Sequence, residues 1–192
     1  MNSKLVTPTP RPAPFEYRIV VAKQARQLSL WSGSALERTY AIVLGRNSSA
    51  DKSVEGDQAT PLGEFYVCAK NPRSKYFLSL CISYPNAEDA ERGLAAGLIG
   101  ADEHRQILDA ICARRMPPQH TRLGGEIYIH GHGIHGHCIH GHGGHNESRD
   151  GHRAPIDFLQ KDWTRGCIAL SNEDMEDLYD RVAIGTAVRI NE

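Results

Sequence analysis

Two residues of this chain are well suited to covalent chemistry: Cys167, which follows a glycine, and His130, which ends the apolar run Ile127-Tyr128-Ile129. The thiolate is the reactive form of cysteine, so a working cysteine needs a nearby imidazole or backbone N–H groups that stabilise its charge. Gly166 lets the backbone approach a substrate closely, and amides around Cys167 could point at the oxyanion that forms when a carbonyl is attacked. The pattern predicts a cysteine nucleophile with a histidine base. The alternative is a small apolar residue in a packed turn.

The segments around these two residues predict how they are held. The side chain of a histidine at the end of a strand is better oriented than one on a glycine-rich loop. Ser171 to Asp174 form a capping pattern that opens a helix, so Cys167 lies just before a helix N-terminus. The positive end of the helix dipole stabilises a thiolate there.

The rest of the chain reads as short strands followed by helices, which predicts a mainly β (α+β) domain. Residues 1–15 are rich in proline and predict a disordered arm, so folded structure is expected over 16–192. In the second helix Cys112 is expected to face the core together with Ile107. Strands are expected at 17–22, 27–31, 38–44, 64–69, 78–84, 126–130 and 186–190, and helices at 87–97, at 102–115 and after Ser171.

Composition excludes several classes of function. The chain has 192 residues, 22 basic and 23 acidic, and a formal net charge of -1, so we expect neither a nucleic-acid partner nor an anionic membrane surface. No run of 18 apolar residues predicts a transmembrane segment, and the first residues do not resemble an export signal. The five cysteines are irregularly spaced, which does not predict a disulfide framework.

Four motifs, in their order along the chain, resemble the L,D-transpeptidase catalytic domain of the YkuD type. They are the early strand pair, Gly-Asp-x-x-Thr-Pro-x-Gly at 56–63, Ile-His-Gly at 129–131 and Thr-x-Gly-Cys at 164–167. The match runs from about Tyr17 to Ile190. The stretch 79–86 resembles the murein-processing branch of the family, which includes hydrolases as well as cross-linking enzymes. The resemblance implies a β-sandwich with a few helices.

The resemblance also implies a reaction and roles. Family members attack the carbonyl of a diaminopimelate residue in a peptidoglycan stem peptide and form an acyl-enzyme, which an amine or water resolves. This implies peptidoglycan as partner, no required cofactor, and a place in the periplasm or cell envelope. Cys167 would be the nucleophile and His130 the base. Around the substrate and oxyanion the resemblance implies Gly131, Thr164, Arg165 and Gly166.

The sequence departs from the family pattern at two positions near the cysteine. Many members have histidine where this chain has Arg165, and many have arginine or asparagine where it has Ala169. An arginine cannot act as a base, but it can bind a substrate carboxylate. We therefore expect Arg165 to contact substrate.

A histidine-rich insert, at about 131–152, separates His130 from Cys167 by 37 positions, about twice the family's usual spacing. Eight of the ten histidines lie between 130 and 152, and His-x-His spacing suits zinc, nickel or copper. A solvated glycine-rich loop is the alternative. The Ile-His-Gly triplet recurs, so His135 and His140 are alternative bases to His130. The candidate metal ligands are His132, His135, His137, His140 and His142.

Three functions remain open from the sequence. The first is an L,D-transpeptidase that joins stem peptides. The second is a hydrolase on the same scaffold, of the L,D-carboxypeptidase or amidase type, in which water is the acceptor. The third is a metal-binding protein that uses the histidine-rich loop.

Overall fold

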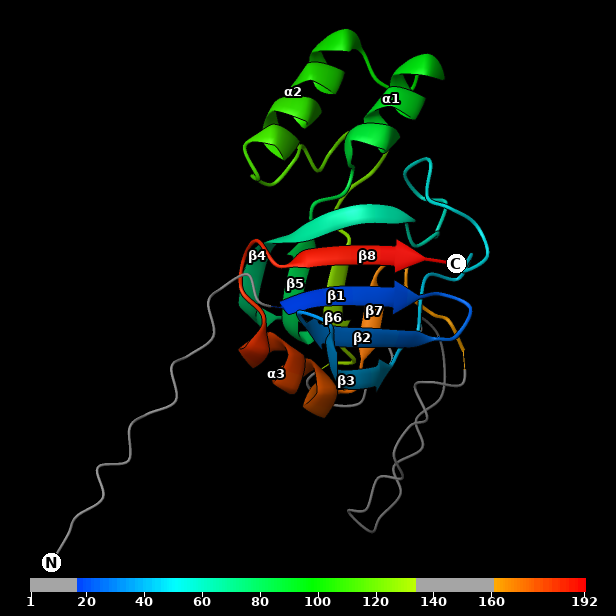
Figure 1. Ribbon diagram of the computed structural model, residues 1–192. Helices are drawn as coiled ribbons and strands as arrows, with labels where there is room; N and C mark the ends of the chain where they lie inside the picture. The colour runs from blue at the N-terminus through cyan, green and yellow to red at the C-terminus, as the bar shows by residue number, and fades with distance from the viewer. Residues whose placement is uncertain (1–16, 134–160) are drawn as a thin grey trace, which may run out of the picture.

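The computed structural model describes residues 17–133 and 161–192, in which eight strands and three helices form a mainly β fold (Figure 1). This confirms the fold class predicted from the sequence. The predicted arm at 1–15 and most of the histidine-rich insert lie outside the described residues. The elements are β1 (Tyr17–Ala22), β2 (Gln27–Ser32), β3 (Ala35–Ala41), β4 (Gly63–Ser74), β5 (Phe77–Ile82), α1 (Ala87–Ala95), α2 (Ala101–Cys112), β6 (Tyr128–Gly131), β7 (Ile168–Leu170), α3 (Asn172–Arg181) and β8 (Ala187–Asn191).

The strands form one sheet, in the order β3-β2-β1-β8-β4-β5-β6-β7, that folds into two layers. The long strand β4 joins the layers: residues 63–66 pair with β8, and residues 67–74 pair with β5 across two register shifts. Such irregularities bend a strand and increase its twist. The β1-β2-β3-β8 half and the β5-β6-β7 half therefore cross each other in Figure 1. Their facing apolar side chains, among them Ile19, Leu28, Leu80, Ile129 and Val188, form the main core.

The segment after β3 links the two far edges of the sheet. Val43 and Ala169 exchange both backbone hydrogen bonds, at 3.0 and 2.9 Å, and Gly45 forms a bridge with Thr164. This pairing gives hydrogen-bond partners to the backbone groups at the edge of β7, and it fixes the chain directly before Cys167. The sheet is thus nearly closed at the point where the predicted nucleophile lies.

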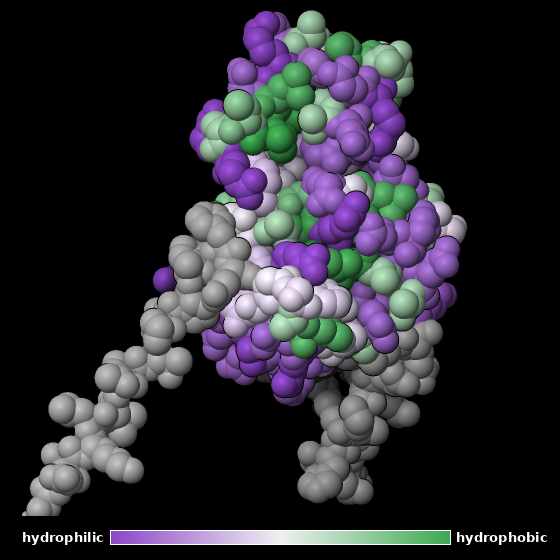
Figure 2. Space-filling view, in the orientation of Figure 1, coloured by the Kyte–Doolittle hydropathy of each residue, from purple (hydrophilic) through white to green (hydrophobic). Residues whose placement is uncertain are grey.

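The helices occupy two places. α1 and α2 stand away from the sheet and share a small core of their own around Ile107 and Leu123. Over this pair, hydrophobic and hydrophilic residues are interspersed on the visible surface (Figure 2). α3 packs against β5 and β6. Its N-cap is Ser171, whose hydroxyl accepts the Asp174 N–H at 3.0 Å, so the helix start predicted there is confirmed.

Two sequence predictions about these elements are wrong. The third strand was expected at 38–44 and lies at Ala35–Ala41, because the turn at Gly33 sets the register close to the end of β2, while residues 42–44 leave the ladder and meet β7. Cys112 is exposed at the end of α2, because the small core of the helix pair ends near Ile111. No helix in residues 17–133 and 161–192 is long and apolar enough to cross a membrane.

Candidate active site around Cys167

The strand register brings His130 and Cys167 together. β6 and β7 are parallel, with Ile129 opposite Ile168 and His130 opposite Ala169. Extending this register by one residue places Cys167 opposite Tyr128, so His130 is its diagonal neighbour on the same face of the sheet. The predicted base therefore lies on β6, and the predicted nucleophile lies directly before the neighbouring strand β7. The alternative bases His135 and His140 lie outside the described residues.

The imidazole of His130 is buried and has a defined tautomer. Its Nδ1 lies 2.6 Å from the carbonyl oxygen of Gly131. A carbonyl only accepts, so Nδ1 carries the hydrogen and Nε2 is the basic nitrogen. Tyr76 stacks on the ring with centroids 4.5 Å apart, and Trp163 meets it edge-on at 5.9 Å. Burial lowers the pKa of His130 to about 4, and Lys75 contributes to this shift.

The thiol of Cys167 is protonated at neutral pH. Its Sγ lies 3.5 Å from the carbonyl oxygen of Glu126 and donates toward it. The pKa of this thiol is raised to about 11, chiefly by burial and in addition by the Glu126 carboxylate; a hydrogen bond with the Tyr128 backbone and the charges of Lys52 and Lys75 act in the opposite direction. The resting pair is thus a neutral thiol beside a neutral imidazole.

The turn before Cys167 uses the threonine and glycine of the Thr-x-Gly-Cys motif for its own structure. The Thr164 hydroxyl donates to the Cys167 carbonyl at 2.6 Å and accepts the Gly166 N–H at 3.2 Å. Gly166 has φ of 122°, and a Cβ there would lie 2.7 Å from the carbonyl oxygen of Ala59. The Thr164 hydroxyl is thus bound twice within the turn, and its predicted contact with substrate stays a prediction. Thr164 is buried, and the Gly166 N–H is already bound within the turn.

Gly131, the third predicted site residue, is not among the residues that line the pocket described below. A Cβ on Gly131 would be 2.5 Å from Oδ1 of Asn172 and 2.9 Å from the carbonyl oxygen of Tyr76. Asn172 also donates to the Gly133 carbonyl at 2.8 Å, so α3 holds the chain that leaves β6. Gly131 therefore orients His130 through its carbonyl and through this close packing.

The Gly-Asp-x-x-Thr-Pro-x-Gly segment forms the wall next to the turn. The Asp57 carboxylate accepts the backbone N–H groups of Ser53, Val54 and Ala59 at 2.8 to 3.0 Å, and it pairs with the buried Lys52 at 3.0 Å. Burial alone would raise the pKa of Asp57. The hydrogen bonds to its carboxylate outweigh this effect and hold the pKa below its ordinary value. The loop is thereby fixed against the site.

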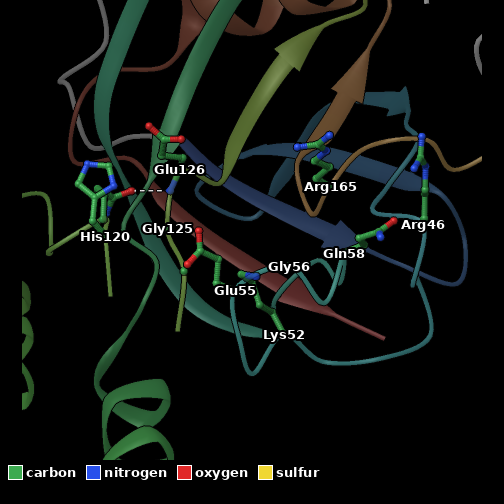
Figure 3. Close-up of a pocket in the computed structure, with 11 residues that line it drawn as sticks. Arg46, Lys52, Glu55, Gly56, Gln58, His120, Gly125, Glu126 and Arg165 are labelled. Atoms are coloured by element: carbon green, nitrogen blue, oxygen red, sulfur yellow. Dashed lines mark hydrogen bonds between the residues drawn. The ribbon is translucent and has the colours of Figure 1, made fainter. Parts of the chain in front are cut away.

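A pocket of about 410 Å³ is lined by Glu126, whose carbonyl contacts Cys167, and by Arg165 of the turn before it (Figure 3). Arg46 and Arg165 lie on one side of it, and Glu55, Glu126 and His120 lie on the other. The predicted contact residue Arg165 is exposed here, as substrate binding requires. The pocket thus has a positive wall, which includes Arg165 two positions before Cys167, and a separate negative wall. Its further lining residues are Lys52, Gly56, Gln58, Gln119, Gly124 and Gly125.

The model of the YkuD L,D-transpeptidase catalytic domain matches residues 16–190. The chain belongs to this family. The YkuD domain resembles a mutant of the helical cell shape determining protein Pgp2 from Campylobacter jejuni, at 22% identity and a TM-score of 0.54, over 92% of this chain and 47% of that chain. It also resembles Bd1075 from Bdellovibrio bacteriovorus, at 17% identity and a TM-score of 0.50, over 92% and 48%.

At these identities the likeness concerns the fold, and the YkuD domain spans about half the length of the two solved structures. The comparison with curated proteins finds no match.

The YkuD domain contains functional neighbours that the sequence patterns did not single out. Tyr76 at the β4-β5 turn covers His130, Glu126 contacts Cys167, and Arg46 lines the pocket. Each comes from a loop whose position depends on the folded sheet, so no periodic signal marks it.

Of the five predicted metal ligands, only His132 lies in the described part of the YkuD domain. Within residues 17–133 and 161–192 no three His, Cys, Asp or Glu side chains are grouped to hold a metal ion. His132 is described, whereas His135, His137, His140 and His142 lie outside the described residues, so the metal site stays a prediction.

Proposed function

We propose that this YkuD domain is a cysteine-dependent L,D-transpeptidase that acts on peptidoglycan stem peptides through an acyl-enzyme thioester. The observation that carries the proposal is the placement of His130 on β6 and of Cys167 directly before the neighbouring parallel strand β7, with Nδ1 of His130 bound to the Gly131 carbonyl. This arrangement leaves the basic Nε2 available on the side chain next to the thiol.

The chemistry follows from the neutral pair. His130 Nε2 takes the proton from Cys167 Sγ as the sulfur forms a bond to the substrate carbonyl carbon. The negative charge moves to the carbonyl oxygen, for which the Cys167 N–H is the donor that the turn can offer, since the Gly166 N–H is bound to Thr164. The imidazolium then gives its proton to the departing amine as the C–N bond breaks, which leaves a thioester. An acceptor amine attacks the thioester and regenerates the thiol.

The pocket supports a substrate that carries both charges. The guanidinium groups of Arg46 and Arg165 suit a carboxylate, and the carboxylates of Glu55 and Glu126 on the opposite wall suit an ammonium group. A diaminopimelate side chain carries one of each. A peptidoglycan substrate places the reaction in the cell envelope.

The proposal is tested with purified disaccharide tetrapeptides, incubated with wild type, Cys167→Ala and Arg105→Gln and analysed by mass spectrometry. Arg105 is exposed on α2 and serves as the matched control. Cross-linked dimers that need Cys167 and form normally in the Arg105 variant are the expected result. Tripeptide without dimers means that water is the acceptor and assigns the domain to hydrolases. Turnover that survives in Cys167→Ala overturns the cysteine mechanism.

A parallel incubation with chelator addresses the histidine-rich segment. Zinc, nickel or copper bound near Cys167 would make the sulfur a poorer nucleophile, so metal there would inhibit. If activity is the same with and without chelator, and added zinc has no effect, metal regulation by this segment is excluded.

A further inference from the structure

The loop between α2 and β6 brings a strained residue to the nucleophile. Glu126 is a non-glycine residue with φ of 54°, in the left-handed region, and its carbonyl oxygen lies 3.5 Å from Cys167 Sγ. An L-residue with a Cβ is unfavourable in this region unless its surroundings hold it there. The direction of the Glu126 carbonyl toward the thiol depends on this backbone conformation.

The side chain of Gln119 holds Glu126 in place. Its Oε1 accepts the Glu126 N–H at 2.7 Å. Its Nε2 donates to the carbonyls of Tyr84, at 3.0 Å, and Pro117, at 2.8 Å. Two carbonyl partners on one side and an N–H on the other fix the orientation of the amide, since only nitrogen can donate. Gln119 therefore ties Glu126 to two chain segments.

The glycines before Glu126 allow this tie to be short. Gly124 has φ of 85°, and a Cβ on Gly125 would lie 2.3 Å from the carbonyl oxygen of Gln119. The chain thus folds back closely on Gln119, and any side chain at position 125 would push the Gln119 backbone away from the loop that carries Glu126. The loop can move Glu126 only if these contacts break.

We propose that Gln119 is a positioning residue that holds the Glu126 carbonyl against the Cys167 thiol and so keeps the nucleophile protonated until substrate binds. This rests on the proposed function of Cys167. An S–H that donates to a carbonyl is stabilised relative to the thiolate, which cannot donate. A thiol kept in this form reacts slowly with oxidants and alkylating agents, because the thiolate is the reactive species.

Other groups also act on this thiol, so the test must isolate the carbonyl. Substitution of Gln119 removes none of these groups, although the loop that carries Glu126 can shift. The titratable and charged groups that face Cys167 or influence its pKa are Cys81, Glu126, Tyr128, His130, Lys52 and Lys75.

The test uses Gln119→Met, which keeps the length of the side chain and removes its three hydrogen bonds. Iodoacetamide modification of Cys167 is followed by peptide mass spectrometry from pH 7 to 10, together with kcat on tetrapeptide and Tm. Loss of one hydrogen bond to the thiol predicts modification about three- to tenfold faster at pH 8. We expect kcat to fall, because Glu126 and the pocket wall shift. A merely structural residue would change Tm without speeding alkylation.

A rescue makes the experiment specific. Asparagine tolerates the left-handed conformation, whereas valine does not. In a Glu126→Asn background, Gln119→Met should have little effect on alkylation or kcat. Glu126→Val alone should also speed alkylation, and it tests the inference if Gln119→Met is too unstable to purify. Glu126→Asn is the control for Glu126→Val, because it also lacks the carboxylate.

The outcomes separate this inference from the proposed function. Wild-type alkylation rates in both Gln119→Met and Glu126→Val overturn the positioning role. Equal losses in Gln119→Met with and without Glu126→Asn overturn it as well. If wild type has no turnover on tetrapeptide, the proposed function fails, while the alkylation rates still decide whether Gln119 controls the thiol.

Discussion

Tyr76 lies on the imidazole of His130, with ring centroids 4.5 Å apart and planes 23° from parallel. The turn that carries Tyr76 belongs to the β4-β5 hairpin, and the base belongs to β6, so residues distant in sequence enclose one ring. This contact excludes water from His130, which is 2% exposed. The low pKa of the base therefore depends on a neighbour that takes no part in proton transfer.

Replacing Tyr76 with alanine should make the base easier to protonate. Burial is the main cause that lowers the pKa of His130 to about 4, and uncovering one face restores hydration of the imidazolium. His130 must be neutral to accept a proton, so activity is lost as pH falls through its pKa. We expect the acid limb of kcat/KM to move from about pH 4 in wild type to higher pH in Tyr76→Ala. Tyr76→Phe keeps the stack and should keep the wild-type profile; an unshifted limb in Tyr76→Ala would show that other groups enclose the base.

The same imidazole should make the fold sensitive to acid. In the unfolded chain His130 binds a proton near its ordinary pKa of 6.5, and in the folded chain near 4. The unfolded state therefore holds more protons between these values, so the free energy of unfolding is undiminished above pH 6.5 and falls as pH drops toward 4. The loss from this residue is about 3 kcal/mol.

Urea unfolding at pH 7 and pH 4.5 measures this effect in wild type and in His130→Asn, which does not titrate. Asp89 titrates in the same range, because burial raises its pKa to about 6, so only the difference between the two proteins is informative. The variant should lose less stability than wild type between the two pH values. Equal losses would mean that His130 is protonated without cost in the folded state.

The loop beside the pocket should depend on its buried ion pair. The side chains of Lys52 and Asp57 are 4% and 13% exposed and lie 3.0 Å apart. Asp57→Ala leaves the Lys52 ammonium buried without its carboxylate and removes three acceptor bonds to the backbone. We expect a loss of about 3–5 kcal/mol in unfolding free energy, measured in urea.

A surface pair provides the comparison for this measurement. Arg189 and Glu64 lie 2.8 Å apart but are 62% and 66% exposed, so Glu64→Ala should cost no more than about 1 kcal/mol. If both substitutions cost the same, the Asp57 loop is not held by its buried pair.

Local patterns explain which parts of the fold the sequence predicts. The strand at 17–22 appears at the predicted residues, because its apolar side chains face the core and a turn limits it. The start of α1 follows from Asn86, whose side chain accepts the Asp89 N–H as a cap. The three-residue strand β7 is too short to carry a periodic pattern, and it forms because β6 and the segment at Val43 pair with it.

The site shows the same division between local and long-range information. Cys167 and His130 are recognisable as a candidate nucleophile and base because residue type and neighbours in sequence mark them. The left-handed backbone of Glu126 is not recognisable, because a contact with Gln119 across the loop selects it over the intrinsic preference of a glutamate. The hydrogen bonds of Thr164 are not recognisable for a related reason: whether a hydroxyl faces solvent or backbone depends on the turn, which binds it twice.

Arg165 should act on substrate binding more than on chemistry. Its side chain is exposed on the pocket wall directly before the Gly166-Cys167 pair, where many family members have histidine. A guanidinium binds a carboxylate through two parallel hydrogen bonds, an arrangement that glutamine cannot reproduce. Arg165→Gln should raise KM for the tetrapeptide about tenfold with little change in kcat, because the contact is made equally in the ground state and the transition state.

A substrate change identifies the group that Arg165 binds. Steady-state kinetics are measured for wild type, Arg165→Gln and Arg165→Lys with a tetrapeptide and with its analogue in which the diaminopimelate carboxylate is amidated. The amide removes the negative charge, so wild type and Arg165→Gln should then have similar KM values. Lysine keeps the charge without the planar fork and should give an intermediate KM with the free carboxylate. A tenfold difference that persists with the amidated substrate would assign Arg165 to another part of the stem peptide.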